Sequence, residues 1–222
     1  MTTCPWSNYE PATIGWCEER VCGWVVEPSN AWSNLAYVLV GIIVLMTARR
    51  RVPLVLIGVA SILIGFGSFA FHGTGTRIGE LIDVSAMYLL GGLGVMFAAR
   101  RILGLSTTGL VLGYLAVVAT CVALMIGLHN NGIVVFALLV TFTVGGEIYL
   151  YRTGRAAPSY HAQKWMIACF VIAFLIWNLD RSRILCSPTN HLVTGHAVWH
   201  VLTAVAVYFF ARQQEPLLDD AR

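Results

Sequence analysis

Seven long apolar runs constrain this chain more than any other feature of its sequence. They fall near residues 32–48, 53–71, 79–99, 107–127, 132–150, 163–179 and 194–211. A helix needs about 20 mainly apolar residues to cross the hydrocarbon core of a bilayer. Arginines, glycines or polar residues bound each run. The pattern therefore predicts an all-α membrane protein built as a bundle of seven transmembrane helices.

The composition agrees with a chain that lies almost entirely in a membrane. Of its 222 residues, 58% are hydrophobic and 11% are charged, whereas soluble domains average about 45–50% apolar and about 25% charged residues. Seven spans would take roughly 140 residues, so we expect one membrane domain over residues 1–222 and no separate catalytic module. The basic residues form no continuous stripe of the kind that indicates nucleic-acid binding.

The distribution of Lys and Arg predicts the orientation, because cytoplasmic loops are enriched in both. With the N-terminus outside, ten of the fourteen basic residues lie on the cytoplasmic side. The other four remain outside, namely Arg20, Arg77, Arg181 and Arg183. We therefore predict an extracytoplasmic segment over residues 1–31 and a short cytoplasmic tail over residues 213–222. The first segment lacks the basic start and apolar core of a cleavable signal peptide.

The six cysteines divide by their depth in this topology. Cys121 and Cys169 lie within apolar runs and are expected to be free, small apolar side chains. Four lie in outer segments, namely Cys4, Cys17, Cys22 and Cys186. Disulfides persist in oxidising compartments, so these four can form two bridges. Four cysteines allow three pairings, and their spacing does not choose among them.

Ionisable side chains within transmembrane helices are costly, and they usually face a bundle interior or a cavity, so they indicate candidate functional sites. They occur here at six positions, namely His72, Asp83, Glu147, Asp180, His196 and His200. Glu147 falls at the cytoplasmic end of its run, where we expect it to pair with an arginine or reach the headgroups. His129, His161 and His191 fall in loops and are expected to be solvated.

Three of these residues fit a metal site. His196 and His200 are four residues apart in an apolar run, so on a helix their imidazoles project from one face. In the predicted topology His72 lies at the same outer depth. An i, i+4 pair alone also suits hydrogen bonding between helices, but three neutral imidazoles with one open position form the ligand set of hydrolytic zinc sites. The sequence therefore predicts a Zn²⁺ site.

Two further polar residues belong beside this predicted site. Asp83 can act as a fourth ligand that closes a structural site, or as the general base that takes a proton from the attacking water. Ser68 shares a helix face with His72 and can stabilise an oxyanion, although small polar residues also pack between membrane helices. The residues themselves indicate a zinc-assisted hydrolase, with a lipid from the bilayer as its substrate.

Three blocks of sequence carry a family resemblance. They are WCEE at 16–19 with EPSNAWSN at 27–34, GSFAFH at 67–72 with LID at 81–83, and WNLD at 177–180 with HAVWHVLT at 196–203. Together they resemble the alkaline ceramidase family of seven-helix membrane amidohydrolases. The resemblance implies hydrolysis of the amide of a ceramide to a sphingoid base and a free fatty acid.

The same resemblance implies roles for individual residues. The three histidines would be zinc ligands, Asp83 would activate the water, and Ser68 would lie beside the oxyanion. In the outer segments, Cys17 would pair with Cys186, which leaves Cys4 with Cys22.

A calcium site in the N-terminal segment is also implied by the resemblance. The backbone carbonyl of Trp16 and the carboxylates of Glu18 and Glu27 match the family's Ca²⁺ ligands. Two positions depart from the pattern, because Gly15 replaces an aspartate and Arg20 replaces an asparagine. Calcium takes six or more oxygen ligands, several of them carboxylates. The departures therefore remove one carboxylate from the predicted site and place a cation beside it.

Two other classes of function share parts of this pattern. Proteins resembling the adiponectin and progestin receptors have a similar seven-helix zinc arrangement, but with a long cytoplasmic N-terminus. A transporter with a proton relay would carry ionisable groups at several depths, whereas here they concentrate at one level. We therefore favour an intramembrane zinc-dependent ceramidase that takes a ceramide-like lipid from the bilayer, with its site towards the extracytoplasmic side. The sequence indicates no obligate protein partner.

Overall fold

The structure, a computed structural model, describes residues 3–127, 132–155 and 159–219. These residues form helices joined by short connections and contain no β-strand. The helices are α1 (Pro28–Ser33), α2 (Leu35–Thr47), α3 (Val52–Thr74), α4 (Arg77–Leu103), α5 (Thr107–Gly127), α6 (Gly132–Arg152), α7 (Tyr160–Arg181) and α8 (Gly195–Asp219). The predicted all-α class is therefore confirmed.

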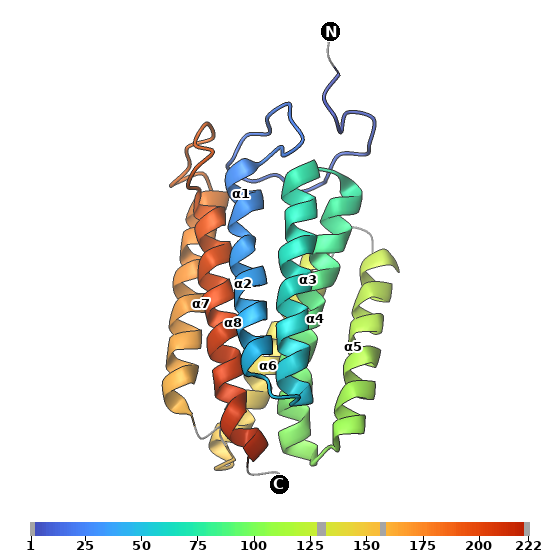
Figure 1. The fold of residues 1–222 in the computed structure, drawn as a ribbon, viewed down its shortest axis with the longest axis vertical. Coiled ribbons are helices and arrows are strands. Elements are labelled where there is room, and N and C mark those ends of the chain that lie inside the picture. The colour runs from blue at the N-terminus through green and yellow to red at the C-terminus, as the bar shows by residue number, and fades with distance from the viewer. Residues whose placement is uncertain (1–2, 128–131, 156–158, 220–222) are drawn as a thin grey trace.

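The long helices run side by side along a common axis, with the two chain ends at opposite ends of the bundle (Figure 1). Residues 3–27 lie over one end, as does the connection between α7 and α8. Two disulfides fix this end, Cys4–Cys22 and Cys17–Cys186. They are the pairs that the family resemblance implies. Cys121 and Cys169 are free, as expected.

Among the described residues, six helical segments are long and apolar enough to cross a membrane. They are Pro28–Thr47, Val52–Thr74, Arg77–Leu103, Thr107–Gly127, Gly132–Arg152 and His161–Arg181. α8 is not one of the six, although it runs alongside them (Figure 1). The seventh crossing and the orientation therefore stay predictions. α8 also continues to Asp219, so the predicted tail is helical over residues 213–219.

Apolar side chains cover the outside of the bundle as well as its core. Leu112 on α5, Phe142 on α6 and Leu175 on α7 are exposed, as are many other large apolar side chains on these helices. A water-soluble protein seldom exposes so much contiguous apolar surface. Hydrocarbon chains of a bilayer would cover it, which agrees with a multi-pass membrane protein.

Glycines allow α2 and α3 to approach closely. A Cβ added at Gly41 would lie 2.6 Å from the carbonyl oxygen of Gly58, and one at Gly58 would lie 3.0 Å from the carbonyl oxygen of Gly41. Small residues of this kind bring the backbones of membrane helices together. Gly75 follows the last residue of α3, and its φ of 62° is left-handed and favours glycine. This turn directs the chain into α4, so that both helices begin or end beside the N-terminal segment.

Candidate metal centre

Three buried histidines meet at the end of the bundle that the N-terminal segment covers. His72 lies in the last turn of α3, and His196 and His200 lie in the first two turns of α8. One ring nitrogen from each histidine lies within 4.8 Å of the other two, and the Nε2 atoms of His72 and His196 are 3.2 Å apart. Nitrogens about 2.0–2.1 Å from a tetrahedral zinc ion are about 3.3–3.4 Å apart. The spacing therefore suits a shared metal ion.

Polar partners on the far side of two rings direct the other nitrogens towards the centre. The Nδ1 atom of His72 lies 2.6 Å from Oε2 of Glu27, and the Nδ1 atom of His200 lies 2.8 Å from Oγ of Ser33. Histidines that bind metals commonly donate their second N–H group to such a partner, which orients the ring. Both contacts leave Nε2 to face the centre.

The third ring is held by stacking. The indole of Trp16 lies against the imidazole of His196, with ring centroids 3.9 Å apart and planes inclined by 21°. The guanidinium of Arg181 lies over the ring of Trp16 and also over the ring of Trp177. Three imidazoles in fixed orientations form a donor set that suits Zn²⁺, so the residues present fit the predicted metal.

Asp83 and Ser68 lie beside the histidine cluster. Ser68 is buried on α3, one turn before His72, and its side chain interacts with the carboxylate of Asp83 on α4. Asp83 also interacts electrostatically with His72. Among the described residues, the group with ligand atoms close enough to hold one ion contains the three histidines and not Asp83. The structure thus brings all five predicted residues together.

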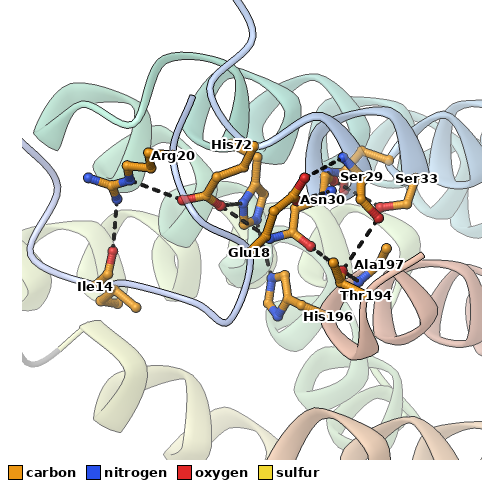
Figure 2. A network of polar contacts seen from close by, with 12 residues as sticks. Ile14, Glu18, Arg20, Ser29, Asn30, Ser33, His72, Thr194, His196 and Ala197 are labelled. Carbon is orange, nitrogen blue, oxygen red and sulfur yellow. Dashed lines mark hydrogen bonds and ion pairs between the residues drawn. The ribbon is translucent and has the colours of Figure 1, made fainter. Parts of the chain in front are cut away.

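Glu27 connects the N-terminal segment to α3. The carboxylate is 1% exposed, and its Oε2 contacts His72 and accepts a hydrogen bond from Nδ2 of Asn30 at 3.2 Å. Its Oε1 accepts a hydrogen bond from Nε of Arg20 at 3.0 Å. The contacts of Arg20 and His72 are drawn in Figure 2. Burial raises the pKa of Glu27, but His72, Arg20 and Asn30 outweigh burial and hold this pKa below its ordinary value.

Glu18 is fully engaged by protein donors. It is buried, and its two carboxylate oxygens accept hydrogen bonds from the backbone N–H groups of Ser29 and Asn30, both at 2.9 Å. Its Oε1 also lies 3.0 Å from Nδ1 of His191. The carboxylate therefore holds the first turn of α1 against the N-terminal segment (Figure 2).

These contacts test the Ca²⁺ prediction at Trp16, Glu18 and Glu27. A calcium ion needs six or more oxygen ligands, yet both carboxylates are taken by N–H donors and a guanidinium lies on Glu27. The residues present do not fit a calcium ion, and the prediction finds no support in this geometry.

Some residues at the site have no obvious signal in the sequence. His191 was expected to be solvated, but it is partly buried against Glu18, because the Cys17–Cys186 disulfide draws its loop over the N-terminal segment. Ser33 lies in the EPSNAWSN block, which gave no indication that it contacts His200. Such pairings depend on how the loop before α8 and the helix α1 are placed over the end of the bundle.

The remaining ionisable residues have structural partners. Oδ1 of Asp180 accepts a hydrogen bond from the backbone N–H of Gly195 at 2.9 Å, which fixes the start of α8. Glu147 pairs with Arg101 at 2.7 Å, which confirms one of its two expected environments. His161 is exposed at the start of α7, and His129 lies outside the described residues.

Comparison with known proteins identifies one family over most of the chain. A sequence model of the family described as Ceramidase matches residues 8–216. Alkaline ceramidase YPC1 of Saccharomyces cerevisiae is 25% identical to the chain, over 93% of this chain and 76% of its own length. Alkaline ceramidase 1 of Homo sapiens is 24% identical, over 89% of this chain and 79% of its own length.

Proposed function

The chain belongs to the ceramidase family, and from this premise we propose that it is an intramembrane, zinc-dependent amidase. Its substrate is ceramide or a closely related N-acyl sphingolipid, and its products are a sphingoid base and a free fatty acid. The observation that supports this proposal best is the buried cluster of His72, His196 and His200 with Asp83 beside it. Both ceramidase relatives agree with the reaction, and nothing comparable supports the receptor alternative.

His72, His196 and His200 would hold the zinc ion through Nε2. When bound there, zinc supplies a Lewis acid for the amide carbonyl and lowers the pKa of water. Three histidine ligands would leave room for water on the ion, and Asp83, which lies outside the ligand group, would stay available as a base.

Asp83 accepts the proton of the attacking water and then returns it to the amide nitrogen as the C–N bond breaks. The water oxygen becomes part of the fatty-acid carboxylate, and the nitrogen leaves as the amine of the sphingoid base. Ser68 can donate its hydroxyl proton to the carbonyl oxygen as negative charge develops there. Before the reaction, the same hydroxyl interacts with the carboxylate of Asp83 and orients it, and it is released for the carbonyl oxygen once Asp83 has taken up the proton.

The surroundings of the site suit a lipid substrate. The histidines lie where α3 ends and α8 begins, at the end of the bundle that residues 3–27 cover. The orientation inferred from the basic residues puts this end on the extracytoplasmic side. A ceramide could keep its chains among apolar helices while its amide reaches the histidines. The site would therefore take its lipid substrate from the bilayer.

Measuring zinc and hydrolysis together on the purified protein tests this function. We expect about one zinc per chain and, with ceramide in mixed micelles, equimolar release of fatty acid and sphingoid base. Removing zinc with a chelator should stop release, and adding zinc back should restore it. A panel of other N-acyl lipids serves as the specificity control. Protein that holds zinc but hydrolyses neither ceramide nor any member of the panel would contradict the proposal.

A further inference from the structure

We propose that the guanidinium of Arg20 is a built-in cation that takes the place of an inorganic ion at Glu27 and positions His72. The N-terminal segment of this chain would then need no calcium. The inference rests on the proposed zinc site, because Arg20 acts through Glu27 on a predicted zinc ligand. Arg20 is a positioning residue and has no contact with the reacting atoms.

A continuous chain of short contacts carries the inference. Nε of Arg20 donates to Oε1 of Glu27 at 3.0 Å, and Oε2 of the same carboxylate lies 2.6 Å from Nδ1 of His72. Nη2 of Arg20 donates to the carbonyl oxygen of Ile14 at 3.1 Å, which fixes the guanidinium from its other side. The carboxylate thus bridges a fixed cation and an imidazole.

Charge balance gives Arg20 its importance. The side chain of Glu27 is 1% exposed, and a buried carboxylate is costly unless it is paired and hydrogen-bonded. Asn30 contributes a neutral donor, and a histidine that binds zinc is itself neutral. The positive charge opposite Glu27 therefore comes from Arg20. Without it, the buried carboxylate would lack its compensating charge, and the contact from its Oε2 atom that orients the ring of His72 would be weakened.

The local backbone holds the guanidinium in place, although its side chain is 33% exposed. It packs against Gly75, where an added Cβ would lie 3.2 Å from Nε of Arg20. This is the C-terminal end of α3, where the helix dipole favours a cation. The Cys17–Cys186 and Cys4–Cys22 disulfides lie on either side of Arg20 in the chain. The segment is therefore restrained at both ends.

The neighbouring residues leave little for a divalent cation. Both oxygens of Glu18 accept backbone N–H groups, and Oε1 of Glu27 is occupied by Arg20. Gly15 is exposed and has no side chain to supply a ligand. Arg20 thus provides one positive charge at the point where a calcium ion would have to bridge these groups.

Zinc affinity tests the positioning role. It can be measured by competition with a chromophoric chelator for the wild type, Arg20→Lys and Arg20→Met. Changing an outer partner of a ligand typically weakens metal binding about 10–100-fold, so we expect a loss of about 10-fold in Arg20→Met and a partial recovery in Arg20→Lys. Arg183→Met removes the same charge from an exposed loop at the same end of the bundle and should leave zinc affinity unchanged. Equal affinities for Arg20→Met and the wild type would overturn the proposal.

Calcium binding by the wild type tests the substitution without any variant. Equilibrium dialysis of the zinc-loaded protein against calcium should show no uptake at the protein, and calcium should not shift its thermal unfolding. One calcium bound per chain, lost in Glu27→Gln, would overturn the proposal. Neither measurement uses hydrolysis, so a chain with Arg20-dependent zinc affinity and no ceramidase activity would contradict the proposed function and leave this inference intact.

Discussion

Single side chains decide whether the histidine cluster acts as a hydrolytic centre. Residue spacing and the predicted topology together predicted the cluster, since His196 and His200 share a helix face and His72 ends a run at the same predicted depth. The outer partners, Glu27 and Ser33, could not be predicted in this way. Glu27 is the N-cap residue of α1 and Ser33 ends this helix, so both contacts depend on how α1 is placed against α3 and α8.

Replacing Asp83 by Asn separates the two roles considered for this carboxylate. As a general base it should be needed for turnover, so we expect hydrolysis to fall about 10²–10⁴-fold while zinc content stays at the wild-type level. Metal analysis and fatty-acid release on the same preparation check both quantities. The control is Glu215→Gln, which also turns a carboxylate into an amide but lies at the end of α8 away from the histidines. Loss of zinc from Asp83→Asn would make Asp83 a ligand and contradict the base assignment.

Removing the hydroxyl of Ser33 should weaken zinc binding. Ser33→Ala leaves Nδ1 of His200 without its partner at 2.8 Å, and lost outer partners typically cost about 10–100-fold in metal affinity. Chelator competition measures the effect. Ser182→Ala, which removes an exposed hydroxyl bonded only to the backbone of α7, should have no effect. An unchanged affinity in Ser33→Ala would show that this contact does not orient the ring.

Among the helices, the apolar runs predicted six of the spans well, because length and hydropathy suffice to identify them. The start of the first helix was less predictable. It begins at Pro28, before the apolar run that indicated it. The backbone N–H groups of this extra turn are satisfied by Glu18, which lies far enough away in sequence that no local pattern shows it.

Packing between α2 and α3 should be sensitive to an added methyl group. A Cβ at Gly41 would lie 2.6 Å from a backbone oxygen, and overpacking of this kind typically costs about 1–3 kcal/mol. We expect Gly41→Ala to lower the thermal unfolding temperature in detergent. Gly145→Ala on α6, where an added Cβ meets nothing within 4 Å, should leave it unchanged or raise it slightly. Equal unfolding temperatures would show that the two helices can separate without cost.

For the whole molecule, the end of the bundle that carries the histidines depends on its covalent links. The Cys17–Cys186 bridge joins residues 169 positions apart, and it fixes the segment that supplies Trp16, Glu18 and Glu27. The sequence left the pairing open, and only the family resemblance chose between the alternatives. The bridged loops also bring His191 to Glu18, and no local sequence pattern indicates this contact.

Removing this bridge should destabilise the protein and loosen its zinc. Loss of a native disulfide typically costs about 2–5 kcal/mol, so the Cys17→Ser, Cys186→Ser double variant should unfold at lower temperature and release zinc faster to a chelator. A variant with the free cysteines Cys121 and Cys169 changed to Ala is the control. Wild-type unfolding and zinc retention in the double variant would contradict a structural role for the bridge.

Zinc-edge X-ray absorption on the purified protein tests the central claim most directly, namely that three histidines hold a zinc ion with one position left for water. The predicted first shell has three imidazole nitrogens at about 2.0–2.1 Å and one oxygen from solvent, and His200→Ala should lose one nitrogen or the ion itself. A fourth ligand atom from the protein, or a shell without three imidazoles, would contradict it.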